Sequence, residues 1–194
     1  MKRTARVLEW VVIGLMATVS AVGTLFVTGY AVEDRGAPQG IAAFLAMALS
    51  IVGLSLVARF VPSVGAWVLG ALCLLAVALP LWGEFAFDSY RAFLDSVGPV
   101  FAIALLVLMV PLAVLGLAHP AIAGTLLTGT AVASYAIFVS TVSGEPWLGL
   151  GASLTTSSTM LVAPMVIGGL ALVVAALLIH SELTHHPGQA VPSA

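Results

Sequence analysis

Charged residues divide this chain into long uncharged stretches of nearly constant length. No Asp, Glu, Lys or Arg occurs between Glu9 and Glu33, between Arg35 and Arg59, or between Arg59 and Glu84. Each stretch holds roughly 20 residues or slightly more, the length that an α-helix needs to cross a hydrocarbon core about 30 Å thick. Because the apolar residues run continuously and do not alternate with polar ones, each stretch predicts a transmembrane helix, not a barrel strand.

The second half of the chain predicts three more helices. The uncharged stretch from Asp95 to Glu145 is about twice as long as one span requires. His119-Pro120 interrupts it midway. Proline is suited to the turn between two helices, so this stretch predicts two spans and a tight turn. The stretch from Glu145 to Glu182 predicts a Gly- and Ser/Thr-rich loop followed by one further span.

Composition excludes a water-soluble protein. The 194 residues are 61% hydrophobic and only 7% charged, and the mean hydropathy is +1.20, whereas soluble domains carry about 25% charged residues. Soluble enzymes, nucleic-acid-binding proteins and disordered chains are excluded for the same reason. We expect an all-α, polytopic six-helix bundle over residues 1–186 and a mobile tail at 187–194. The predicted spans are 7–30, 40–60, 64–82, 99–118, 121–141 and 158–180.

The basic residues predict the orientation of the bundle. With the N-terminus inside, most of them become cytoplasmic, namely Lys2, Arg3, Arg6 and Arg59, as the positive-inside rule requires. Both termini are then cytoplasmic, and the Ala-, Val-, Leu- and Gly-rich composition suggests a bacterial inner membrane. The basic N-terminus also fits a signal peptide with a small-residue site at 29–31. The length of the apolar run favours an uncleaved span.

A weak internal repeat is visible. Arg59, His119 and His180 end three helices that run inward, at nearly equal intervals, and the first two are soon followed by proline. These similarities fit a parallel repeat of helical hairpins. Chance similarity within a largely apolar alphabet explains them equally well.

The predicted spans lack the residues that membrane chemistry requires. No Asp, Glu, Lys or Arg lies in the middle of a span, which argues against a carboxylate-coupled transporter and a voltage sensor. No His pair suited to haem lies within the spans, and no hydrolase or phosphate-binding motif occurs. Cys73 is the single cysteine, so an intrachain disulfide and a Cys-based metal cluster are excluded. We therefore predict no catalytic residue, no metal and no cofactor.

Hydroxyl side chains are the main polar groups inside the spans. The candidates for a cavity lining are Thr24, Thr125, Thr128, Ser134 and Tyr135. Hydroxyls and small residues most often let helices approach and hydrogen-bond, each such bond contributing about 0.6–2 kcal/mol. The alternative interpretation is a path for a small polar or amphipathic substrate.

Two prolines mark candidate hinges. Pro111 and Pro164 lie inside the fourth and sixth predicted spans, where each removes a backbone donor and bends its helix. Gly168 and Gly169 follow Pro164 by about one turn, which makes the sixth span the stronger candidate. Packed membrane helices also tolerate proline for structural reasons alone.

The outer loop near 84–97 is the most regular polar segment. Glu84, Asp88, Arg91 and Asp95 follow helical spacing on one face, and apolar residues cover the other, which predicts a short amphipathic helix on the outer surface. A solvated face is the favoured interpretation. A surface for docking a partner comes second, and a weak divalent-cation site third.

The chain is therefore predicted to be a non-catalytic membrane protein, an accessory or structural subunit of a bacterial membrane complex. The alternative is a small permease or channel-like protein for an uncharged or lipophilic solute. The expected partners are the lipid bilayer and other membrane subunits or a second copy, with no nucleic acid.

Overall fold

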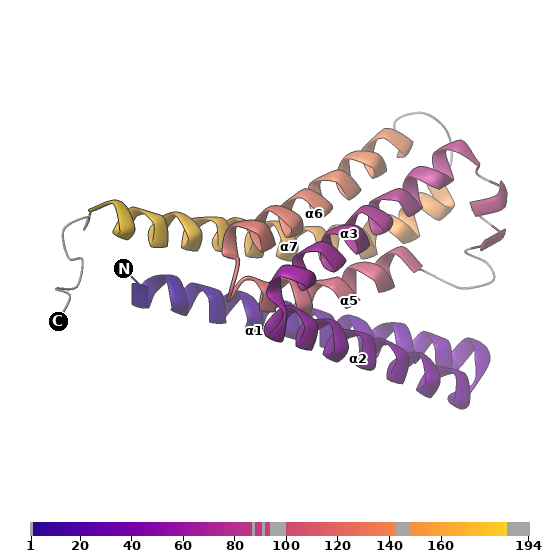
Figure 1. Ribbon diagram of the computed structural model, residues 1–194. Coiled ribbons are helices and arrows are strands. Elements are labelled where there is room, and N and C mark those ends of the chain that lie inside the picture. The colour runs from indigo at the N-terminus through magenta and orange to yellow at the C-terminus, as the bar shows by residue number, and fades with distance from the viewer. Residues whose placement is uncertain (1, 87, 91, 94–99, 143–147, 186–194) are drawn as a thin grey trace.

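The computed structural model describes the backbone of residues 2–86, 88–90, 92–93, 100–142 and 148–185. It describes their side chains except at 2, 83–84, 137–142, 148–160 and 182–185. This part of the chain forms helices and no strand, so the all-α prediction is confirmed (Figure 1). The long helices are α1 (Lys2–Arg35), α2 (Ala37–Phe60), α3 (Pro62–Phe85), α5 (Val100–Leu115), α6 (Pro120–Val142) and α7 (Leu148–His185).

Four helical segments are long and apolar enough to cross a membrane. They are Arg3–Arg35, Ala37–Phe60, Pro62–Trp82 and Leu161–Ser181. Helix α5 is more apolar than these segments but shorter. At 1.5 Å per residue its 16 residues extend about 24 Å, against a hydrocarbon core of about 30 Å. The lengths and composition of the helices are those of a membrane protein.

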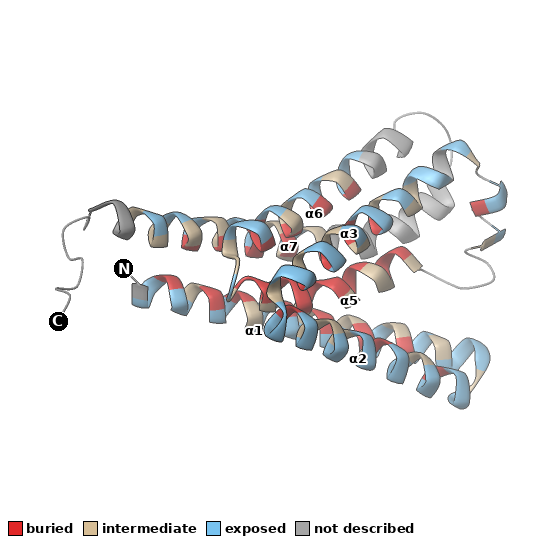
Figure 2. Ribbon diagram, viewed as in Figure 1, coloured by how far each residue is buried: buried red, intermediate tan, exposed pale blue. Residues whose placement is uncertain are grey.

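Helix α5 is the core of the bundle. It packs against α1, α2, α3, α6 and α7, and Figure 2 shows it buried along its length between the other helices. Leu105, Met109 and Leu112 are fully buried. From Val100 to Leu115 the helix carries no polar side chain, and a helix that is apolar on every face is stable only where apolar groups surround it.

The outer surface of the bundle is also apolar. Phe60 is 76% exposed, Trp67 83% and Phe85 89%, and exposed leucines and valines accompany them along α1, α2 and α3. Soluble monomers rarely expose contiguous apolar surface of this extent. Lipid is the solvent that fits this surface.

Short turns join the helices at the predicted prolines. Helix α3 begins at Pro62 and α6 at Pro120, directly after the turns that end α2 and α5. Gly65 makes the α2–α3 hairpin tight, because an added Cβ there would lie 2.8 Å from the Cα of Ala58. Between α1 and α2 the chain reverses at Gly36, whose φ of 90° is readily reached only by glycine.

Several helices are longer than the predicted spans. Helix α1 runs to Arg35 and α7 begins at Leu148, where the sequence predicted a loop and a span starting near residue 158. Glycine weakens a helix by about 1 kcal/mol without breaking it, so Gly149 and Gly151 do not prevent the early start. The predicted tail at 187–194 lies outside the described residues.

Candidate functional site

Three hydroxyl residues of α1, namely Ser20, Thr24 and Thr28, are buried. Ser20 is buried and donates a hydrogen bond from Oγ to the carbonyl oxygen of Leu106, at 2.9 Å. Thr28 donates to the carbonyl oxygen of Thr24 in its own helix. Thr24 is buried, and its own hydroxyl has no hydrogen-bond partner in the described part of the chain. Gly23 lies between these residues and is in close contact with Leu106. This face of α1 is therefore a packing surface.

The predicted cavity residues on α6 point in different directions. Thr125 is exposed and donates to the carbonyl of Ala121, at 2.8 Å. Ser134 is buried and donates to the carbonyl of Thr130, at 2.6 Å. Tyr135 is 47% exposed on the outer surface. The structure does not bring these side chains together around a common space.

Thr128 lies at the crossing of α6 and α7, the most extensive helix contact in the bundle. A Cβ added to Gly169 would lie 2.9 Å from the Thr128 amide nitrogen and 2.8 Å from the Gly124 carbonyl oxygen. A Cβ added to Gly124 would lie 2.6 Å from the Gly169 carbonyl oxygen. The two backbones touch here, as small residues permit in membrane helices. The Thr128 side chain lies over Gly169 and is part of the same contact.

The candidate hinge residues of α7 also pack closely. Gly168 faces α1, where an added Cβ would lie 2.5 Å from Met16 Cε and 3.3 Å from Val12 Cγ1. Gly168 and Gly169 therefore allow α7 to fit between α1 and α6. Pro164 lies inside α7, half-buried, one turn before this contact. The hinge interpretation of these residues stays a prediction.

Two prolines lie inside helices, each within the last six residues of its helix. Pro111 lies buried in α5, as the sequence placed it, and Pro80 lies inside α3. Each lacks an N–H, so the carbonyl four residues earlier loses its helical donor. These carbonyls belong to Val107 and Ala76. Pro80 was not among the predicted hinge residues, although its position within an apolar run was visible in the sequence.

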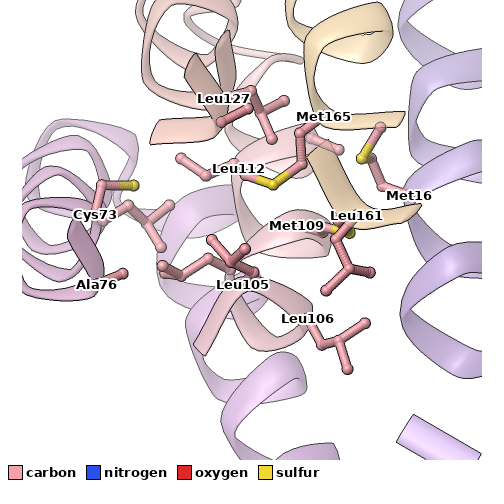
Figure 3. Packing of buried hydrophobic residues seen from close by; sticks show 14 of the residues in the cluster. Met16, Cys73, Ala76, Leu105, Leu106, Met109, Leu112, Leu127, Leu161 and Met165 are labelled. Atoms are coloured by element: carbon pink, nitrogen blue, oxygen red, sulfur yellow. The ribbon is translucent and has the colours of Figure 1, made fainter. Parts of the chain in front are cut away.

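The centre of the bundle is filled by apolar side chains. Figure 3 shows Met16, Met109 and Met165 converging from α1, α5 and α7, with Leu112 and Leu127 beside them. All five side chains are fully buried. Methionine adapts its shape to irregular gaps, which suits a point where three helices meet. No polar path through this centre is visible among the described residues.

A cleft of about 580 Å³ lies elsewhere, between α2, α3 and α5. Its wall includes Ser50 and Gly53 of α2, Ala76 of α3, and Ala104 and Leu108 of α5. Among the lining residues Ser50 carries the single polar side chain. None of the residues predicted to line a cavity belongs to it.

The outer segment after α3 is described only in part. Glu84 lies in the last turn of α3, and its side chain lies outside the described residues, as do Arg91 and Asp95 entirely. Asp88 is exposed on a short helical turn.

Aromatic side chains attach this outer segment to the end of α3. The Tyr90 ring packs edge-on against Trp82 with centroids 5.9 Å apart, and Phe93 lies 5.5 Å from the same indole. Burial raises the pKa of the Tyr90 phenol above its usual value.

Glu9 is an ionisable residue near the N-terminal edge of the first predicted span. It is only 7% exposed and shares a buried face of α1 with Ala5 and Val12. Arg6, less than one turn before it, supplies a neighbouring positive charge. At 1.5 Å per residue Glu9 lies about 10 Å from the start of α1, near the helix end and not at its middle. The spacing of Ala5, Glu9 and Val12 was the signal for this burial.

No cluster of metal-ligating side chains occurs in the part of the chain that the structure describes. The chain matches no family model, no curated protein and no solved structure. Its function must therefore be argued from its own residues.

Proposed function

We propose that this chain is a non-catalytic polytopic membrane protein that serves as an accessory or structural subunit of a bacterial inner-membrane complex. The observation that supports this proposal most is the position of the hydroxyls. Ser20 and Thr128 lie at helix contacts, and Ser134 is bonded within its own helix. The centre holds the apolar helix α5 instead of a polar path. Such a bundle provides shape and surface, not chemistry.

The proposed topology has six spans with both termini in the cytoplasm. The start of α1 and the end of α7 lie at the same end of the bundle (Figure 1), as an even number of crossings requires. Helix α5 is short for a span, but protein surrounds it, so its ends need not reach both lipid interfaces. A parallel repeat of helical hairpins is one explanation of the weak internal similarity in the sequence, and chance similarity is the other.

The proposed docking surface is the amphipathic outer segment that carries Glu84, Asp88, Arg91 and Asp95. Asp88 is exposed, and the aromatic contacts of Tyr90 with Trp82 attach the segment to α3. Exposed charge close to this aromatic contact favours recognition of a partner with complementary charge.

Isolation from the native membrane in mild detergent tests this proposal. We expect the chain to co-isolate with a defined membrane protein, and Asp88→Lys to reduce that recovery. Asp34→Lys is the matched control, because Asp34 is an exposed aspartate at the end of α1. A monomeric chain that co-isolates with no other protein would contradict the proposal.

A second candidate is a small permease for an uncharged or lipophilic solute. The buried hydroxyls of Thr24 and Thr128, which lack hydrogen-bond partners in the described part of the chain, are the observation that favours it. Its path would follow α1, α6 and α7. Solute uptake by vesicles that contain the protein should then fall in Thr128→Val and Tyr135→Phe, and unchanged uptake in both variants would remove this candidate.

A further inference from the structure

The cleft between α2, α3 and α5 has a closed floor and an open side. Ala76 and Leu108 are buried at the floor, whereas Ser50, Gly53 and Leu75 are exposed at the rim. The volume of about 580 Å³ falls within the range of sites that bind small molecules. The lining is apolar apart from the Ser50 hydroxyl. The cleft therefore suits a ligand that is mainly hydrocarbon.

The rim continues into the surface that faces lipid. Leu49 and Val52 next to it on α2, and Leu74 on α3, are more than half exposed. Both helices are long and apolar enough to cross a membrane. Whatever enters the cleft therefore comes from the bilayer. An empty apolar cleft would forfeit dispersion contacts along its walls, and water would find almost no hydrogen-bond partner there.

Two of the residues that line the cleft lose a backbone hydrogen bond because a proline follows them by one turn. Ala76 and Val107, whose carbonyls lose their helical donors to Pro80 and Pro111, both line the cleft. Proline bends the helix that contains it. The small residues Gly53 and Ala104 in the wall leave space among the three helices unfilled.

The dimensions of the cleft distinguish a hydrocarbon chain from a helix. Along α5 the wall extends from Val100 to Leu108, which is about 12 Å at 1.5 Å per residue. A helix of a second copy or of a partner that crosses the membrane would need a groove about 30 Å long. The cleft is less than half that length, which is enough to hold part of one hydrocarbon chain.

We propose that this cleft binds one hydrocarbon chain of a membrane lipid and holds it more firmly than the surrounding bilayer lipid. This site is independent of the proposed accessory role, since it needs no partner protein. The bound chain completes the packing among α2, α3 and α5, and its headgroup lies outside the cleft at the membrane surface.

Two glycines provide a matched pair of variants. Gly53 lines the cleft, whereas Gly129 lies exposed on α6, and a Cβ added at either would have no neighbour within 4 Å. Gly53→Leu and Gly129→Leu therefore add the same side chain at positions where its Cβ meets no neighbour, and both variants should fold. The new leucine occupies the cleft in the first and extends into lipid in the second.

Native mass spectrometry after partial removal of lipid measures the occupancy, with phosphatidylethanolamine as the probe. We expect wild type and Gly129→Leu to retain one lipid per chain, and Gly53→Leu to retain at least about tenfold less. Equal retention in the two variants would overturn the proposal. A wild-type dimer that Gly53→Leu dissociates would also overturn it, because the occupant would then be a second copy.

A second measurement uses the unaltered protein and so does not depend on how a variant folds. Phosphatidylethanolamine with a photoreactive group in the middle of one acyl chain is reconstituted with wild type and illuminated. We expect labelled peptides to come mainly from the cleft walls of α2, α3 and α5. Labelling spread evenly over all lipid-facing helices would refute a specific site.

Discussion

The contact between Gly124 of α6 and Gly169 of α7 gives the sharpest test of the packing. Gly124→Ala places a Cβ 2.6 Å from the Gly169 carbonyl oxygen and 3.0 Å from the Val173 amide nitrogen. Ordinary van der Waals contact begins at 3.4 Å, so the helices must separate locally by about 0.8 Å. Both neighbours are backbone atoms, which cannot rotate away as a flexible side chain can.

The expected magnitude follows from a comparison with Gly129→Ala. Gly129 lies on the same helix, five residues further on, and its added Cβ meets nothing within 4 Å. Alanine favours the helix over glycine by about 1 kcal/mol in both variants, so this term cancels in the comparison. Overpacking costs about 1–3 kcal/mol. Gly124→Ala should therefore be less stable than Gly129→Ala by about 1–3 kcal/mol.

Unfolding by sodium dodecyl sulfate, followed by circular dichroism in mixed micelles, measures both free energies of unfolding. Gly169→Ala should match Gly124→Ala, because its added Cβ meets the backbone of α6 at the same helix crossing. Equal stability of Gly124→Ala and Gly129→Ala would refute the close crossing of α6 and α7.

Further predictions concern single polar groups. Ser20→Ala should lower the free energy of unfolding by about 0.6 kcal/mol, because its bond to the Leu106 carbonyl joins two helices; the same measurement on Thr18→Ala should show almost no change, since that exposed hydroxyl bonds within its own helix. Tyr90 should ionise above the usual tyrosine pKa of about 10 in an ultraviolet absorbance titration, with Tyr90→Phe as the reference spectrum. Because the raised pKa belongs to the folded state, the stability linked to Tyr90 is complete below the unfolded pKa and is lost as the pH rises through the folded pKa. A Tyr90 that ionises at the usual value would show that its ring is not buried.

The sequence was informative about where helices begin and end. Charged residues and prolines mark boundaries that the physics of the bilayer enforces, so the turns at Pro62 and Pro120 were predictable. The sequence also carried a signal for the central position of α5, which the predictions did not include. The segment from Val100 to Leu115 carries no polar side chain on any face, and such a helix belongs inside the bundle.

The positions of the hydroxyls could not be predicted in the same way. Whether Thr128 faces a cavity or a neighbouring helix depends on how far α6 rotates about its axis. That rotation is decided by the contact of Gly124 with Gly169, residues distant in sequence. The cleft had no sequence signal either, because it arises from a gap among α2, α3 and α5 and not from a motif.

Cysteine accessibility in intact membranes tests most directly whether the centre of this bundle is dry. In a Cys73→Ser background, single cysteines are introduced by Ala113→Cys in the core of α5, by Ser134→Cys in α6, and by Asp88→Cys at an exposed outer position. A membrane-impermeant maleimide should label Asp88→Cys rapidly, and should label the other two only after denaturation. Rapid labelling of Ala113→Cys or Ser134→Cys in the folded protein would show that water reaches the centre and would contradict the account.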